Sequence, residues 1–387
     1  MKYRVNFFIL FFILCTPLSF ELFDVPSSIQ KGTKMASWLT MLIGLIILLC
    51  FKDFKATIAS SRCSYKMLFF LSVSSILAGS TYGFLSSLVL ILFAFYLDQA
   101  ERYYKHEGIV NNSVITAFVI ITSISFILSL AGQSYIISDG YMRLAGIVGH
   151  PSQSSQIATI ALILVFFSEI KPYFKILILA ICLYVIIESG GRTISIAMMA
   201  SLIMTSLMTK YGLRYFLKSL IAVGVLAPFL LIFIMPLIES QLSDFLFISR
   251  SGDLRELYTL SGRIPLWEAL IDYVGSNLLL GIGYGESKNL LPLLYETKWG
   301  WSTDSAHNVY LHVLYESGLF GLLVLISYLI RIVNYVDSKP QFAILLFMLT
   351  VSIMSSSFAG PGVSTLMLIL LALPWLGFKK ELRSQKN

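Results

Sequence analysis

Long apolar runs recur along the whole chain, and they constrain its fold more than any other feature. A helix that crosses a bilayer needs about 20 predominantly apolar residues. Runs of this kind, several at the short end of the range, lie at 5–20, 36–51, 65–80, 82–97, 111–131, 155–169, 173–188, 192–209, 215–238, 309–336, 341–358 and 362–378. The pattern predicts an all-α, polytopic membrane protein with about twelve transmembrane helices. We expect residues 1–387 to form a single membrane domain.

Composition agrees with lipid as the main solvent. The chain is 57% hydrophobic and only 13% charged, whereas a soluble domain carries about 25% charge. The four cysteines lie far apart in or beside apolar runs with no CxxC spacing, so we expect neither a disulfide framework nor a zinc site. The first run follows Lys2 and Arg4 and has no clear cleavage site after it, which predicts a retained signal anchor.

The basic residues test this map independently. With the N-terminus inside, most of the 28 Lys and Arg residues fall in cytoplasmic segments. The short outer loops hold only Lys31, Lys34, Arg143 and Arg192. This is the bias of the positive-inside rule, and it accounts for the net charge of +7 without nucleic acid as a partner. Residues 239–306, between the ninth and tenth runs, are predicted to form one large loop on the non-cytoplasmic side.

The long loop contains its own structural signals. Ser261 can cap a short helix over Ile264–Val274, with Pro265 in its first turn. The alternating glycines of Gly281-Ile282-Gly283-Tyr284-Gly285 could cradle a phosphate. However, no strand–glycine–helix unit surrounds them, so a tight turn is the favoured interpretation.

The segment 304–308 is predicted to open the helix that follows the loop. With Asp304 or Ser305 as the N-cap, His307 falls in the first turn, where the positive helix end favours a neutral imidazole. A His-Asn pair at a helix start can serve capping or chemistry. His312, five residues on, does not share a helix face with His307, so the two are a poor metal pair. Gly318 and Gly321 are expected to break or pack the following segment, which is too long for one straight span.

Three arginines lie at outer boundaries of spans or in the long loop: Arg143, Arg192 and Arg263. A single arginine at a membrane edge is usually a headgroup anchor. Several guanidinium groups near one histidine would instead suit a diphosphate, because each presents planar paired donors to phosphate oxygens. Most predicted spans lack Asp, Glu, Lys or Arg in their central turns, which argues against an ion-coupled carrier.

At these positions the sequence resembles the O-antigen ligase and polysaccharide polymerase superfamily. His307-Asn308, nine residues and Gly318-Leu319-Phe320-Gly321 fit its His-Asn-x9-Gly-x-x-Gly pattern. The resemblance continues in three shorter stretches: Ser189-Gly190-Gly191-Arg192, Gly262-Arg263-Ile264-Pro265-Leu266-Trp267 and Gly281-Ile282-Gly283. One departure is at His150-Pro151-Ser152, where many relatives carry an Asn after the corresponding pair.

The resemblance implies a metal-independent, cofactor-free membrane glycosyltransferase of the GT-C kind in the bacterial inner membrane. Its donor would be an oligosaccharide on undecaprenyl diphosphate, used on the periplasmic face together with a glycan acceptor. His307 would be the catalytic base, Arg192, Arg263 and Arg143 would bind the diphosphate, and Asn308, Trp267, Gly318 and Gly321 would support the site. Membrane lipid is an expected partner, and the resemblance allows a chain-length regulator as another.

Several functions remain open at this stage. The sequence motifs around Arg263 and His307, Ser-Gly-Arg-x-x-x-Trp and His-Asn-x-Tyr-Leu, favour a polymerase of O-antigen or exopolysaccharide repeat units. A ligase of the same family would transfer the glycan to lipid A–core instead. From other classes, a transporter or flippase for lipid-linked sugars and a non-catalytic scaffold are the alternatives.

Overall fold

The computed structural model describes residues 62–103, 109–138, 141–238, 260, 262–294, 303–356, 358–359 and 363–376. The first two predicted spans, the retained signal anchor and much of the 239–306 loop, Ser261 included, therefore lie outside the described residues. The single membrane domain over residues 1–387 remains a prediction.

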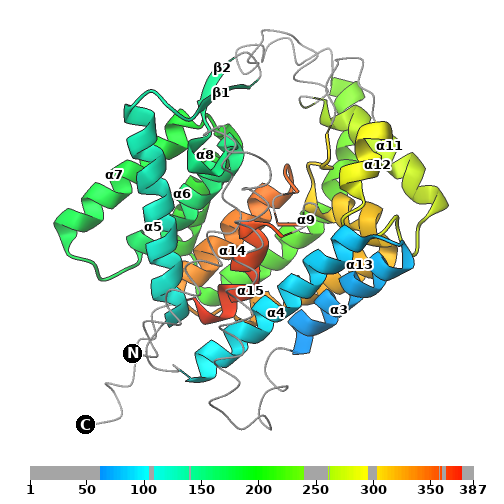
Figure 1. Ribbon diagram of the computed structural model, residues 1–387, viewed down its shortest axis with the longest axis horizontal. Helices are drawn as coiled ribbons and strands as arrows, with labels where there is room; N and C mark the ends of the chain where they lie inside the picture. Colours follow the sequence, from blue (N-terminus) through cyan, green and yellow to red (C-terminus); the bar gives the residue numbers. More distant parts are fainter. Residues whose placement is uncertain are drawn as a thin grey trace.

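The described chain is almost entirely helical (Figure 1). Its α-helices are α3 (Arg62–Leu77), α4 (Thr81–Tyr103), α5 (Ile109–Leu130), α6 (Pro151–Phe166), α7 (Pro172–Glu188), α8 (Arg192–Leu207), α9 (Lys210–Ile238), α11 (Arg263–Ser276), α12 (Ser287–Leu294), α13 (Val309–Tyr335), α14 (Lys339–Ser352) and α15 (Thr365–Ala372). Two 3-10 turns follow β2 and α15, at Gly146–Val148 and Leu373–Trp375. These helices overlap ten of the twelve predicted apolar runs.

One β-hairpin was not predicted. Strands β1 (Tyr135–Ser138) and β2 (Tyr141–Leu144) pair antiparallel, with Tyr135 opposite Leu144 and Ile136 opposite Arg143. The hairpin lies at the upper end of the molecule in Figure 1. Its segment carries β-favouring Tyr and Ile residues, but it is too short to stand out beside the apolar runs.

Four described helices are long and apolar enough to cross a membrane: parts of α4, α5, α9 and α13. Helices α3, α6, α8 and α14 are apolar but shorter. Large apolar side chains are exposed on the outer surfaces of α7 and α9, among them Ile176, Phe233 and Leu237. Soluble monomers rarely expose apolar area on this scale. A membrane protein is therefore supported, while the count of twelve spans remains a prediction.

Helix α14 lies at the centre of the bundle. It packs against α6, α8 and α9, and nearly every side chain from Pro340 to Leu349 is buried. A helix that is apolar on all sides must be covered by protein or lipid, and here neighbouring helices cover it. A capping box between Ser338 and Gln341 starts the helix.

The last predicted run, 362–378, forms less helix than expected. Helix α15 has eight residues, a rise of about 12 Å, followed by the 3-10 turn at Leu373–Trp375. Pro374 has no N–H with which to continue the α-helix. The carbonyl of Leu370, which Pro374 leaves without a helical donor, accepts the hydroxyl of Tyr328. The carbonyl of Leu373 accepts Nε2 of Gln341 in addition to the Leu376 N–H. This segment is too short to cross a hydrocarbon core of about 30 Å by itself.

The kink in α13 joins the two glycine motifs. Gly318 has φ 64° and ψ −168°, so the helical bonds to Leu319 and Phe320 are lost. The loop before α12 replaces them. Ile282 and Gly283 donate N–H groups to the carbonyls of Tyr315 and Glu316, and Leu319 and Phe320 donate to Leu278 and Leu279.

Glycine is required on both sides of this junction. A Cβ at Gly318 would collide with the Leu279 backbone, and one at Gly281 would collide with the Glu316 backbone. Gly321 lies on the next turn, where a Cβ would meet Ser317. The break at Gly318 is therefore confirmed, and the Gly281–Gly285 segment is a tight turn that packs on it.

Candidate active site

A glycine turn places Arg192 at the start of α8. Gly190 follows the end of α7 with φ 64°, the left-handed conformation that commonly ends helices. Gly191 is then the N-cap of α8, and because it has no side chain, the first-turn N–H groups receive no side-chain cap. Arg192 is the first residue of α8, and its side chain is exposed.

The β1–β2 hairpin contacts the turn between α7 and α8 through two hydrogen bonds. Nε of Arg143, on β2, donates to the carbonyl oxygen of Ser189 at 2.9 Å. On β1, the Tyr135 hydroxyl donates to Glu188 at 3.3 Å. Arg143 thus lies beside the Ser189–Arg192 turn, and the two arginines predicted on separate outer loops belong to one local structure.

Helix α11 begins in the same way as α8. Its N-cap is Gly262, with φ 82° and no side-chain cap, and Arg263 is its first residue. The predicted short helix is therefore confirmed, with its start one residue before Ile264, but its N-cap is Gly262 rather than Ser261. The Arg263 guanidinium donates to the Leu260 carbonyl at 2.9 Å. Two glycine–arginine helix starts thus each combine a guanidinium with the positive end of a helix.

His307 does not lie in a helix, contrary to the prediction. Helix α13 begins at Val309 with Asn308 as its N-cap, and neither Asp304 nor Ser305 caps it. His307 precedes the cap with φ 53°, a left-handed conformation that is uncommon for residues other than glycine. Its backbone N–H donates to Oγ of Ser305 at 3.3 Å, and its Nε2 lies 3.4 Å from Oγ1 of Thr303. The imidazole is therefore presented from a short structured loop.

Asn308 joins three helices. Its side-chain oxygen accepts the Leu311 N–H at 2.9 Å as a helix cap. Its Nδ2 donates to the carbonyls of Gly224 in α9 (3.1 Å) and Ile353 at the end of α14 (3.0 Å). The Gly224 carbonyl needs this donor, because the residue four positions on is Pro228, which has no N–H.

Trp267 supports the histidine loop from α11. Its side chain is fully buried, and its Nε1–H donates to the carbonyl of Ala306 at 2.8 Å. Because Ala306 directly precedes His307, this bond links the glycine–arginine helix to the imidazole. The supporting role of Trp267 in the site remains a prediction.

Electrostatic interactions of His307 and His150 link the histidine loop to Arg263 and Arg143. Burial is the largest cause that lowers the pKa of His307 to about 3, followed by the Arg263 cation and then by electrostatic interactions with His312 and His150. Burial and then the Arg143 cation also lower the pKa of His150, while Asp304 acts in the opposite direction. His307 is therefore neutral at physiological pH. Burial and Arg263 cause this, rather than the helix position predicted from the sequence.

The sequence analysis missed two buried polar residues, Glu316 and Ser287, and considered His312 only as a metal partner of His307. His312 and Glu316 lie one helical turn apart in α13, with Nε2 of His312 3.5 Å from Oε1 of Glu316, and both are fully buried. The Ser287 N–H donates to the same Glu316 oxygen at 3.3 Å. The i, i+4 spacing of His and Glu in an apolar run was the available signal. Ionisable groups therefore also occur inside a candidate span, beyond those expected at the outer face.

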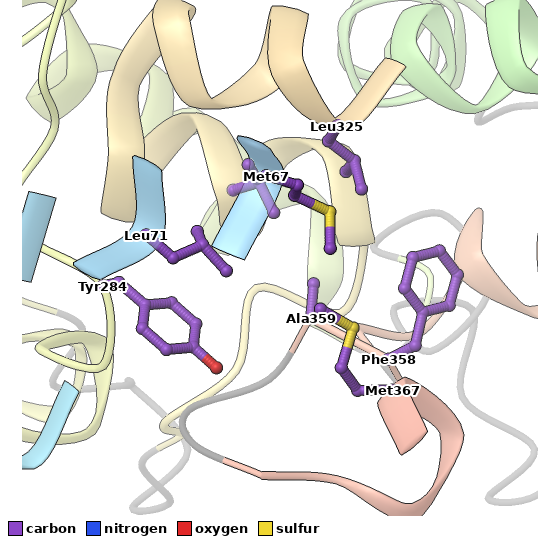
Figure 2. Close-up of a pocket in the computed structure, with 8 residues that line it drawn as sticks. Met67, Leu71, Tyr284, Leu325, Phe358, Ala359 and Met367 are labelled. Carbon is purple, nitrogen blue, oxygen red and sulfur yellow. The ribbon is translucent and has the colours of Figure 1, made fainter. Parts of the chain in front are cut away.

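A cavity lies elsewhere in the bundle, among α3, α13 and the segment before α15 (Figure 2). Its volume of about 20 Å³ holds one water-sized molecule and no sugar diphosphate. The cavity is lined by Met67, Leu71, Tyr284, Val313, Leu325, Phe358, Ala359 and Met367. Apart from the Tyr284 hydroxyl this lining is apolar, and it includes neither His307 nor the three arginines. In the described residues, no group of three or more His, Cys, Asp or Glu is placed to hold a metal ion.

Comparison with known protein families identifies the region that carries these residues. Residues 176–326 match the family model described as O-antigen ligase. This match supports the resemblance of the chain to the O-antigen ligase and polymerase superfamily. The matched region contains Arg192, Arg263, Trp267, His307, Asn308, Gly318 and Gly321, whereas Arg143 and His150 precede it. Searches of curated proteins and of solved structures return no match.

Proposed function

We propose that this O-antigen ligase-family protein is a bacterial inner-membrane glycosyltransferase that polymerises O-antigen or exopolysaccharide repeat units. Its donor is a glycan on undecaprenyl diphosphate, used on the periplasmic face. The observation that carries the proposal is a half-buried His307 whose pKa is lowered by desolvation and then by the Arg263 cation, so that its imidazole is neutral. A neutral imidazole can accept a proton, and an adjacent guanidinium can bind a leaving phosphate.

In the proposed reaction an acceptor sugar hydroxyl attacks the anomeric carbon of the donor. The new glycosidic C–O bond forms as the C–O bond to the diphosphate breaks, and the electron pair leaves with the diphosphate. His307 takes the hydroxyl proton. The proposed acceptor is the next lipid-linked repeat unit, which receives the growing chain.

The arginines and helix ends are proposed to bind the diphosphate without a metal. Arg192 and Arg263 each begin a helix after a glycine N-cap, so a guanidinium and uncapped backbone N–H groups occur together. Helix N-termini favour phosphate groups, and arginine adds paired hydrogen bonds. Arg143 contacts the Ser189–Arg192 turn, which supports a role beside Arg192. Preorganised cations of this kind stabilise charge that develops on a leaving group.

The direct test is transfer by the purified protein with a synthetic undecaprenyl-diphosphate oligosaccharide. His307→Ala should lower the rate by about 10²–10⁴-fold, the usual contribution of a general base. Arg192→Lys should also reduce the rate strongly, because an ammonium group cannot copy the guanidinium fork. Lys210→Gln is a suitable control, since Lys210 is exposed and pairs with Asp337 away from the site. Full activity of His307→Ala would remove His307 from the mechanism.

A second candidate is a ligase that transfers the glycan to lipid A–core, and the description of the matching family model favours it. Lipid-linked glycans from a deletion strain separate the two by mass. Single repeats accumulate when a polymerase is missing, whereas long lipid-linked chains accumulate when a ligase is missing. A flippase would yield no new glycosidic bond in the purified assay.

A further inference from the structure

The peptide group of Ala306, immediately before His307, is held at both of its polar atoms. Its carbonyl accepts Nε1–H of Trp267 at 2.8 Å, and its N–H donates to Nδ1 of His312 at 3.4 Å. All three residues are buried. The conformation of the histidine loop therefore depends on which nitrogen of His312 carries a proton.

The surroundings of His312 select its tautomer. Nδ1 accepts the Ala306 N–H, so it cannot itself carry a hydrogen in that bond. Nε2 then carries the hydrogen, and it faces Oε1 of Glu316 at 3.5 Å. The Ser287 N–H donates to this same oxygen, which holds the carboxylate in place. Ser287, Glu316 and His312 thus form a chain of contacts that ends at the Ala306 peptide.

This arrangement does not fit a Ser-His-Glu hydrolase. In such triads the serine and the carboxylate contact opposite ring nitrogens, whereas here the Ser287 hydroxyl and Glu316 both lie 3.5 Å from Nε2. Ser287, His312 and Glu316 are also fully buried, so substrate cannot reach them. They must act through another residue.

We propose that His312 and Glu316 are positioning residues that hold His307 in its reactive place, an inference that rests on the proposed function. Glu316 orients His312, His312 and Trp267 fix the Ala306 peptide, and that peptide sets the left-handed backbone of His307. An ionisable pair inside an apolar helix is costly, and such pairs are retained for function. This explains why α13 carries a carboxylate in a candidate span.

The tautomer can be measured without any activity assay. In the full chain with ¹⁵N-labelled histidine, reconstituted in lipid, nitrogen chemical shifts report which ring nitrogen is protonated. The chain has four histidines, and the spectrum of His312→Gln identifies the signal of His312. We expect Nε2 to be protonated and Nδ1 unprotonated in the wild type. A proton on Nδ1 would overturn the proposal, because the Ala306 N–H could not then donate to it.

Kinetics test whether the pair acts through His307. Glu316→Leu should lower kcat by roughly 10–100-fold, the effect of misplacing a reacting group by about 1 Å, and leave KM for the donor nearly unchanged. Glu316→Gln keeps an acceptor oxygen for Ser287 and His312 and should retain most of the activity. Ser317→Ala is the matched control, since Ser317 is the next buried residue and its hydroxyl has no hydrogen-bond partner among the described residues.

The possible outcomes separate the two proposals. Loss of activity in His307→Ala together with unchanged kcat in Glu316→Leu would refute the positioning role and leave the proposed function intact. Full activity in His307→Ala would refute the proposed function, whatever the state of His312. If Glu316→Leu does not fold, the wild-type spectrum and the kcat of Glu316→Gln still decide. A loss of kcat in Glu316→Gln as large as that expected for Glu316→Leu would also contradict the positioning role of Glu316.

Discussion

Asn308 offers the sharpest test of how the site is built, because its side chain makes three hydrogen bonds to three different segments. Asn308→Ala removes the cap of α13, which is worth about 1 kcal/mol. It also leaves the carbonyls of Gly224 and Ile353 without their donor. A buried group left unsatisfied costs about 1–3 kcal/mol. The expected loss of stability is therefore about 3–7 kcal/mol.

Asn308→Asp separates capping from the three-helix connection. Aspartate is as good an N-cap as asparagine, so a residue that only capped α13 would tolerate it. However, aspartate replaces the Nδ2 donor with an oxygen that faces two carbonyl oxygens. We therefore expect the Asp variant to be at least as unstable as the Ala variant. The assay is thermal unfolding in detergent, followed by intrinsic tryptophan fluorescence.

Two further variants complete this experiment. Ser364→Ala removes the cap of α15, whose hydroxyl accepts the Met367 N–H, and should cost about 1 kcal/mol. Pro228→Ala restores an N–H four residues after Gly224, so it should recover part of the loss in the Asn308→Ala background. A wild-type melting temperature in Asn308→Asp, or simple additivity with Pro228→Ala, would refute the reasoning.

Four other predictions concern the site and the kink. Trp267→Phe keeps the ring but removes the donor to Ala306, so kcat should fall and stability should drop by about 1–3 kcal/mol, measured by transfer rate and melting temperature. Gly318→Ala should lower the melting temperature, because the φ of 64° and ψ of −168° at Gly318 suit only glycine and a Cβ there would meet the Leu279 backbone. Gly275→Ala is the control, since a Cβ at Gly275 would meet open space and should leave the melting temperature unchanged. The acid limb of the pH profile of kcat/KM should lie well below pH 6.5, because the pKa of His307 is about 3 and the imidazole stays unprotonated down to about that pH. An acid limb near pH 6.5 that disappears on replacing His307 would contradict this prediction. Arg263→Gln should shift the acid limb to higher pH, because loss of the Arg263 cation favours the imidazolium form and raises the pKa of His307. Burial is the larger cause of the low pKa and is unchanged in this variant.

Much of the helical arrangement could be predicted from the sequence, whereas the roles of the predicted site residues remain predictions. Ten of the apolar runs overlap helices, because a helix satisfies its backbone within the segment and its apolar surface needs only a hydrophobic environment. The break at Gly318 was also predictable, since spacing and glycine content are local properties. The ends of elements were less accessible. Helix α13 begins at Val309 with Asn308, rather than Asp304 or Ser305, as its N-cap, because the backbone carbonyls of Gly224 on α9 and Ile353 after α14 hold the Asn308 side chain there.

What the sequence determined by itself was chemical class: an apolar helical chain, with one histidine and three arginines near the predicted outer boundaries of its spans. Only the tertiary structure decided which of these groups act on one another. Arg143 reaches the Arg192 turn through a hairpin, Arg263 and burial keep His307 neutral, and His312 with Trp267 holds the peptide before it. These contacts join residues far apart in the chain. Their strength depends on distance and desolvation, which local patterns of residue type do not encode.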